Sequence, residues 1–303
     1  MADNTIKISR RRKILLQNLK GYAFIAPNYI LMLIFLAFPV LFSFILALSD
    51  WDLVSGIKNI IFVGFENFET MVGDKWFVNS LVNNFYYTLT VVPATLFLSL
   101  LIAVLINDFI YGKAVFRLVI FLPYISNIVA VSIVWSLLYS KFGPIVSFLK
   151  SIGIQNPPAF LADRNWAMPA IIIMSIWISV GYAAMIYSAG LQGIPNELYE
   201  ASFIDGAGWW HRFFHITIPM LSPTTFFLLI TSVIGSFKVF GQIQVMTDGG
   251  PMGATSVLVY YIYTSAFKFY KFGYASSMAL VLFVIILIFT LIQWQGQKKW
   301  VNY

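Results

Sequence analysis

Long runs of apolar residues recur along the chain and are separated by shorter polar segments. A helix needs about 20 predominantly apolar residues to cross the ~30 Å hydrocarbon core of a membrane. Six runs reach that length, and they cover residues 22–48, 85–106, 114–139, 167–190, 219–245 and 273–294. We therefore expect an all-α integral membrane protein with six transmembrane helices, flanked by a basic N-terminal segment (1–21) and a short tail (295–303).

The first run is preceded by basic residues, as the apolar stretch of a cleavable signal peptide would be. It is 27 residues long, however, and no small-residue cleavage pattern follows it. We interpret it as a retained first span. Pro39 lies inside this run and predicts a kink in the helix.

The composition agrees with a membrane protein. Apolar residues make up 60% of the chain and charged residues 10%, whereas soluble domains carry roughly a quarter charged residues. The mean hydropathy is +0.83. The chain has no cysteine, which excludes disulfides and thiol chemistry. A net charge of +7 could suggest a nucleic-acid binder, but basic residues beside apolar spans are typical of inner-membrane proteins. We expect membrane lipid, and no nucleic acid, as a partner.

The basic residues also predict the orientation of the spans. Lys and Arg are enriched in cytoplasmic loops, and the segment before the first run contains six of them. We therefore expect both termini and the loop 191–218 in the cytoplasm. The longer loops on the opposite side are amphipathic and are expected to form short helices and turns at the membrane surface.

The loop 191–218 has the sequence features of a folded unit. Asn196 is a good helix N-cap and Pro195 ends the preceding run, which predicts a short helix over residues 197–204. Glycines 206 and 208 then predict a sharp turn, and a second helical pattern continues to Pro219. The tip of this unit is expected to expose residues 199–202. One interpretation is an amphipathic helix at the membrane surface. The other is that the unit docks into a groove of another protein, because the small residues Ala201 and Ser202 beside Glu200 would allow close backbone contact and Glu200 could meet a cationic partner.

Residues 200–219, EASFIDGAGWWHRFFHITIP, resemble the EAA loop in the membrane subunits of bacterial ABC importers. The positions that match the pattern of that loop are Glu200, Ala201, Ser202, Gly206, Ile216 and Pro219. Ser202 replaces the usual second alanine and Ile218 the usual leucine, and both are conservative in size. The resemblance implies a coupling helix that sits in a cleft of an ATPase, where Glu200 meets a basic residue. The expected ATPase-coupling residues are Tyr199, Glu200, Ala201, Ser202, Asp205 and Gly206.

The resemblance extends over nearly the whole chain, which is similar to sugar-importer permeases of the maltose and glycerol-phosphate type. The segments that carry it are FRLVIFLPYISNIVAVSIVW (116–135), GLQGIPNELYEASFIDGA (190–207), TDGGP (247–251) and YYIYTSAF (260–267). It implies a type I ABC importer permease fold in a bacterial inner (plasma) membrane. The implied partners are a second homologous permease in a heterodimer, a cytoplasmic ABC ATPase dimer and an extracytoplasmic solute-binding protein.

The sequence lacks the phosphate-binding pattern G-x-x-x-x-G-K-[ST]. We therefore expect ATP and Mg on the separate ATPase, no cofactor on this chain and no catalytic residue. His211 and His215 stand four residues apart, as zinc ligands can, but no acid lies between them. A metal site is therefore not expected.

Polar side chains with helical spacing suggest a solute pathway. Thr231, Gly235, Lys238 and Gln242 recur at intervals of 4, 3 and 4, which predicts one stripe along a helix. Small residues could instead serve helix packing, and Lys238 could snorkel to the membrane surface. Aromatic and polar side chains together suit a sugar, whose ring stacks and whose hydroxyls form hydrogen bonds. The candidate solute contacts are Tyr124, Asn127, Tyr182, Ser236, Lys238 and Gln242.

Three alternatives stay open at this point. A phosphorylated polyol such as glycerol phosphate could be the solute. A secondary transporter would need carboxylates within the membrane, and none of the six runs contains Asp or Glu. A membrane-embedded enzyme would need a cluster of His, Asp or Glu on one side, whereas the acids outside the loop 191–218 are scattered.

Overall fold

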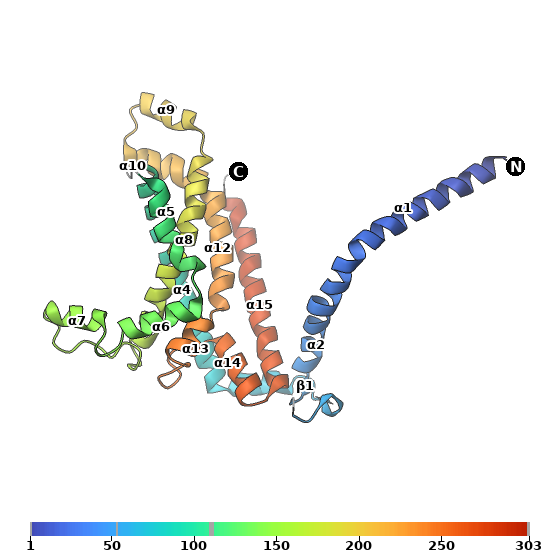
Figure 1. The fold of residues 1–303 in the computed structure, drawn as a ribbon, viewed down its shortest axis with the longest axis horizontal. Helices are drawn as coiled ribbons and strands as arrows, with labels where there is room; N and C mark the ends of the chain where they lie inside the picture. The colour runs from blue at the N-terminus through green and yellow to red at the C-terminus, as the bar shows by residue number, and fades with distance from the viewer. Residues whose placement is uncertain (1, 53, 109–111, 302–303) are drawn as a thin grey trace.

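The computed structural model describes residues 2–52, 54–108 and 112–301, and it is almost entirely helical in these ranges. The described strands are β1 (Ser49–Asp50) and β2 (Ile61–Phe62), which pair antiparallel with Ser49 opposite Phe62. Both termini and α9 (Asn196–Ile204) lie toward the same end of the molecule, and α13 (Gly241–Met246) and α14 (Leu258–Tyr263) lie at the other (Figure 1).

The N-terminal helix is much longer than the first apolar run. It consists of α1 (Ala2–Met32), the π-helical turn η1 (Leu33–Ala37) and α2 (Phe38–Ala47). The π-helical turn directly precedes Pro39, whose missing N–H accounts for the irregular hydrogen bonding there. The kink predicted at Pro39 thus takes the form of a widened turn. Nearly every described side chain from residue 17 to 45 is exposed, and α1 curves away from the other helices (Figure 1).

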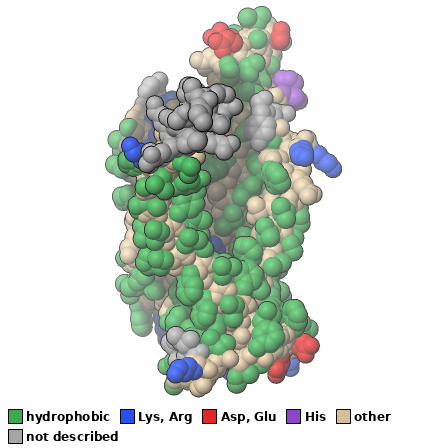
Figure 2. All heavy atoms as spheres, turned by 90° about the vertical axis from the view of Figure 1, so that its right-hand side faces the viewer, with side chains coloured by type: hydrophobic (Ala, Val, Ile, Leu, Met, Phe, Trp, Pro, Cys, Tyr) green, Lys and Arg blue, Asp and Glu red, His purple; other side chains and the backbone are tan. Residues whose placement is uncertain are grey.

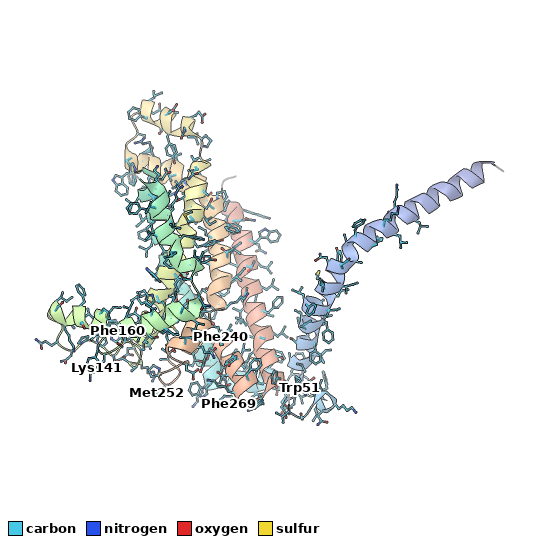
Figure 3. The ribbon with its side chains drawn as sticks, viewed as in Figure 1. Trp51, Lys141, Phe160, Phe240, Met252 and Phe269 are labelled. Atoms are coloured by element: carbon cyan, nitrogen blue, oxygen red, sulfur yellow. The ribbon has the colours of Figure 1, made fainter. Side chains whose placement is uncertain are left out.

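The C-terminal end of α2 is fastened to α15 (Phe272–Gly296). Trp51 is buried there, with its ring centroid 5.5 Å from that of Phe272 and 6.3 Å from that of Phe42 (Figure 3). Gly273 allows the backbones to meet, since a Cβ at that position would lie 2.0 Å from the carbonyl oxygen of Ser49. This junction holds the N-terminal helix at one point and leaves the rest of it free of the bundle.

The centre of the bundle is formed by α4 (Lys75–Asp108) and α8 (Ala167–Gln192), which pack along each other. α5 (Lys113–Ile125) and α12 (Ser222–Phe237) pack against this pair, and α15 packs against α12 and meets α4 where the rings of Phe85 and Phe289 lie 5.8 Å apart. α4 begins ten residues before the apolar run at 85–106, because Asn79, Asn83 and Asn84 bond to the segment 236–258 instead of ending the helix. The predicted positions of the second and fourth spans are thus each occupied by one long helix.

Two of the six expected spans are not straight helices. α5 and α6 (Ile128–Leu138) meet at an angle of 97°, and the helical segment 209–220 meets α12 at 60°. The described part of the chain therefore contains four helices long and apolar enough to cross a membrane, or up to six if each bent pair is one span. The bends lie at Ser126–Asn127 and at Leu221, close to Pro123 and Pro219, where the helical hydrogen bonds are interrupted.

The remaining elements form the loops and short connections. They are the helices α3 (Glu66–Gly73), α7 (Pro144–Ser151), α10 (Trp209–Arg212) and α11 (Ile218–Met220), the π-helical turns η3 (Phe213–Thr217) and η4 (Thr264–Lys268), and the 3-10 turns η2 (Ile57–Asn59) and η5 (Gln297–Lys299). Short helices were expected in the two longer loops, and the small β1–β2 pair was not. On the face shown in Figure 2, hydrophobic side chains cover the middle and acidic side chains lie near the two ends.

Candidate functional site

A central cavity of about 440 Å³ lies among α4, α5, α6, α8, α12 and α13. Five of the six side chains that the sequence suggests as solute contacts line it, namely Tyr124, Tyr182, Ser236, Lys238 and Gln242. Asn127 does not. Its Oδ1 accepts hydrogen bonds from the backbone N–H groups of Val129 (2.9 Å) and Ala130 (3.3 Å), so it caps the N-terminus of α6.

Two tyrosines stack on one side of this cavity. The rings of Tyr124 and Tyr182 have centroids 4.6 Å apart and planes 16° from parallel. Their helices approach closely at Gly181, where an added Cβ would lie 1.9 Å from the carbonyl oxygen of Ile120. Close backbone contact between α5 and α8 therefore brings the two aromatic rings together.

Hydrogen-bonding side chains also line this cavity. Gln242 donates hydrogen bonds from Nε2 to the hydroxyl oxygens of Tyr87 (3.2 Å) and Ser175 (3.3 Å). Thr95 also lines the cavity with a side chain that is only 2% exposed, and its Oγ1 has no hydrogen-bond partner among the described residues. Sequence reasoning missed Tyr87 and Thr95, because single hydroxyl residues within an apolar run are also typical of helix packing.

The helical stripe expected on the fifth span exists only in part. α12 ends at Phe237, Lys238 is its C-cap residue, and Gln242 belongs to the separate helix α13. The prediction of one continuous helix through residue 245 is therefore wrong. Thr231, Gly235, Lys238 and Gln242 nevertheless line the same cavity, because the chain turns around it where α12 ends. Lys238 is exposed toward this space.

In the loop 191–218, α9 ends in a well-defined turn. Gly206 has a φ of +78°, its N–H donates to the carbonyl of Phe203, and the N–H of Ala207 donates to the carbonyl of Ser202. These two bonds form a Schellman motif, in which glycine takes the left-handed conformation that other residues avoid. The helix expected over residues 197–204 is confirmed, although it begins at Asn196, which leaves Pro195 and not Asn196 in the N-cap position.

The exposed surface of α9 differs from the expected one. Tyr199 points inward and shares a 3.0 Å hydrogen bond with the hydroxyl of Thr217, and Ser202 is half-buried. The prediction that both lie exposed at the tip is therefore wrong. The exposed side chains here include Glu200 and Ala201, and also Phe203 and Ile204 at 70% and 83% exposure. Asp205 and Gly206 at the end of the helix are exposed as well.

The segment after the turn is an aromatic helix. Trp209 stacks on Phe213 with centroids 5.3 Å apart, and His211 stacks on His215 at 4.0 Å. Within the ranges that the structure describes, no group of three or more His, Cys, Asp and Glu side chains is placed to hold a metal ion. Among the described contacts, this segment acts as a packed support that joins α9 to α12.

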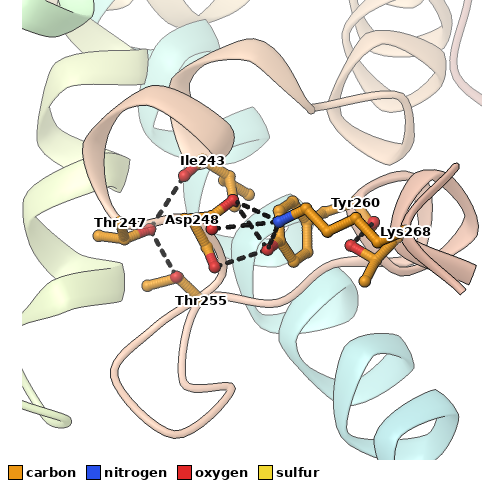
Figure 4. Close-up of polar contacts among 7 residues, drawn as sticks. Ile243, Thr247, Asp248, Thr255, Tyr260 and Lys268 are labelled. Atoms are coloured by element: carbon orange, nitrogen blue, oxygen red, sulfur yellow. Dashed lines mark hydrogen bonds and ion pairs between the residues drawn. The ribbon is translucent and has the colours of Figure 1, made fainter.

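A compact loop follows α13 at the opposite end of the molecule (Figure 4). The hydroxyl of Tyr260 donates to the backbone oxygen of Asp248 (2.6 Å), and the Lys268 ammonium lies 3.1 Å from the Asp248 carboxylate. The pKa of the Asp248 carboxyl lies below its usual value, mainly because Lys268 donates a hydrogen bond to the carboxylate. Gly249 is required because an added Cβ would lie 2.3 Å from the ring of Tyr260. The loop is thus fixed to α14 and η4 by polar contacts.

The chain matches a known protein family and is similar to transport proteins of known type. Residues 61–296 match the family described as "Binding-protein-dependent transport system inner membrane component". The chain is 33% identical over 287 residues to "Lactose transport system permease protein LacF" of Rhizobium radiobacter, which covers 93% of this chain and 95% of that protein. It is 32% identical over 284 residues to "sn-glycerol-3-phosphate transport system permease protein UgpA" of Agrobacterium fabrum, covering 93% and 96%.

A solved structure shares the fold. The chain superposes with a TM-score of 0.81 and 24% identity on a chain of a "bacterial alginate ABC transporter in complex with alginate pentasaccharide-bound periplasmic protein", covering 95% of this chain and 96% of that one. The overall fold of this chain is therefore a known one.

Proposed function

This chain belongs to the family of binding-protein-dependent transport system inner membrane components, and we propose that it forms half of the translocation pathway of a sugar or oligosaccharide importer. It is a multi-pass permease subunit of an ATP-binding-cassette (ABC) importer with the fold of such permeases. It is not an enzyme, and ATP is hydrolysed by a separate chain.

The central cavity is the observation that carries the proposal. The stacked pair Tyr124 and Tyr182 offers an apolar aromatic surface, and the amide of Gln242 and the hydroxyl of Tyr87 offer hydrogen-bonding groups. A pyranose ring needs both, because its C–H face is apolar and its rim is hydroxylated. The unpartnered, buried Oγ1 of Thr95 adds a hydrogen-bonding site that a hydroxyl group of the solute would satisfy.

Coupling to the ATPase is proposed for the exposed side of α9. Glu200, Ala201, Asp205 and Gly206 lie exposed there, beside the apolar side chains described above. Glu200 would pair with a cationic side chain of the ATPase. Tyr199 and Ser202 would act from within the loop, Tyr199 through its bond to Thr217. Because α9 is joined to α12 through packed helical turns, a displacement of α9 would move a wall of the cavity.

The proposed complex contains this chain, a second homologous permease, a cytoplasmic ABC ATPase dimer that binds ATP and Mg, and an extracytoplasmic solute-binding protein. The exposed apolar surface of α1 and α2 supports contacts with lipid and the second permease. In a bacterial inner (plasma) membrane, the N- and C-termini and α9 would face the cytoplasm. ATP-driven closure of the ATPases would draw the two coupling helices together and turn the cavity from inward-open to outward-open.

Reconstitution of the complex in liposomes tests this function. Uptake of a radiolabelled oligosaccharide should require the ATPase, ATP and the solute-binding protein, and omission of any one should reduce uptake to the background of empty liposomes. Uptake by this chain alone, driven by an ion gradient, would contradict the proposal. A phosphorylated polyol is the second candidate solute, favoured by the identity to UgpA, and glycerol phosphate tested in the same assay separates it from a sugar.

A further inference from the structure

The central cavity has an unusual charge composition. Its lining contains tyrosine, serine, threonine and glutamine side chains, and Lys238 is the one charged residue among the described residues that line it. Lys238 is exposed toward this space, and no described residue forms a hydrogen bond or an ion pair with its ammonium group. By contrast, Lys268 at the outer end is paired with Asp248.

The described acidic side chains lie away from this cavity. They occur in the loops and short helices at the two ends of the molecule, at positions 50, 52, 66, 69, 74, 163, 197, 200, 205 and 248. None of them lines the cavity. A cation in a partly apolar cavity attracts a mobile anion more strongly than a cation in bulk water does, since the effective dielectric constant is lower.

The position of Lys238 also suits an interaction with an anion. It is the C-cap residue of α12, where the unpaired carbonyl groups of the last helical turn favour a positive charge. The backbone N–H of Lys238 donates to the carbonyl of Gly235, so the backbone is fixed while the long side chain is free to turn toward a ligand.

We propose that the imported saccharide is anionic, and that Lys238 recognises its carboxylate or phosphate group. This inference rests on the proposed import function. The aromatic pair Tyr124 and Tyr182 would take a sugar ring, Gln242 would bond to hydroxyls, and Lys238 would neutralise the acidic group. A neutral sugar would leave the ammonium of Lys238 without a counter-charge in the cavity.

Solute binding to the purified importer complex in nanodiscs tests the proposal. Calorimetry without the solute-binding protein compares digalacturonate with neutral galactobiose, and glucose 6-phosphate with glucose, so that a uronate and a phosphate are distinguished. The wild-type complex should bind at least one acidic solute about tenfold or more tightly than its neutral counterpart. Lys238→Met should weaken acidic binding about ten- to hundredfold and leave neutral binding nearly unchanged. Lys238→Arg should restore most of the preference. Lys141→Met, the same charge change in an outer loop far from the cavity, is the matched control (Figure 3).

Equal binding of acidic and neutral solutes by the wild-type complex would overturn the anionic proposal. An equal loss of acidic and neutral binding in Lys238→Met would overturn it too, because a contact made only with the acidic group cannot weaken the binding of both solutes equally. Uptake by the wild-type complex in liposomes is measured in parallel, and ATP-dependent uptake of a saccharide would leave the import function standing in either case. Absence of any ATP-dependent saccharide uptake would instead contradict the import function and the inference with it.

Discussion

Replacement of Gly181 by alanine should separate α5 from α8 and disturb the cavity. An added Cβ would lie 1.9 Å from the carbonyl oxygen of Ile120 and 2.7 Å from its carbonyl carbon. Contacts below 3.0 Å are essentially never seen for a real Cβ, and both atoms belong to the backbone. They cannot move aside as a flexible side chain would. The helices must therefore part by more than about 1 Å, which breaks the close packing that small residues give to membrane helices.

The sign of the effect follows from two opposing magnitudes. Alanine in a helix interior is favoured over glycine by about 1 kcal/mol. Overpacking of a well-packed core costs about 1–3 kcal/mol, and occasionally more, and a clash with rigid backbone belongs at the upper end of this range. We therefore expect a net loss of stability of about 1–2 kcal/mol. The stacking distance of 4.6 Å between Tyr124 and Tyr182 should also increase, because Tyr182 is the next residue and Tyr124 lies one turn from Ile120.

Thermal unfolding of the purified complex measures the loss of stability. A saturation curve for solute uptake measures how well the disturbed cavity still binds the solute. Gly181→Ala should lower the melting temperature by several degrees and raise the solute concentration needed for half-maximal uptake. Gly21→Ala is the matched control, since that helical position has no atom within 4 Å of an added Cβ. It should leave the uptake curve near wild type and the melting temperature at or slightly above wild type, because alanine is the better helix former. A melting temperature for Gly181→Ala at or above that of Gly21→Ala would refute the reasoning.

Three further predictions concern single contacts. Gln242→Ala should raise the half-maximal solute concentration roughly three- to tenfold, as loss of hydrogen bonds to the solute would, and an unchanged uptake curve would remove Gln242 from the pathway. Tyr199→Phe should lower the stability of the complex by about 0.5–1.5 kcal/mol, measured by thermal unfolding, because it deletes the bond to Thr217. The ion pair that depresses the pKa of Asp248 stabilises the loop 247–257 above the usual carboxyl pKa of 3.8, and this contribution should be lost as the pH falls through the native pKa. The hydrogen-exchange protection factors of residues 247–257, which correct for the slower intrinsic exchange at low pH, should therefore fall as the pH is lowered below 3.8, and Lys268→Met should lower them already at pH 6.

Sequence patterns located most of the helices because long apolar runs have few alternatives to membrane helices. They did not reveal the bends. The run 114–139 is predominantly apolar, and its hydropathy carries no information about the 97° change of direction between α5 and α6. Asn127 looked like a solute contact because it is a polar residue in an apolar run. Its amide instead caps α6 at the bend, which is a local backbone role.

The residues of the cavity, too, could be predicted from the sequence only in part. The polar spacing that suggested one stripe on the fifth span identified residues that share a cavity, although the helix itself ends at Phe237. Tyr87 and Thr95 could not be chosen from the sequence, because their role depends on how α4 packs beside α12 and α13. In the loop 191–218, the helix and its glycine turn followed from local sequence. The inward orientation of Tyr199 depends on the long-range contact with Thr217.

The central claim is that α9 connects the ATPase to the permease. The most direct test is Glu200→Ala in the reconstituted complex, with solute uptake and solute-stimulated ATP hydrolysis measured together. Glu197→Ala, which removes another exposed carboxylate from the same helix, is the control. The account predicts that Glu200→Ala weakens assembly or uncouples hydrolysis from uptake, while Glu197→Ala stays near wild type. Wild-type uptake and hydrolysis in Glu200→Ala would contradict the proposed role of this carboxylate in coupling.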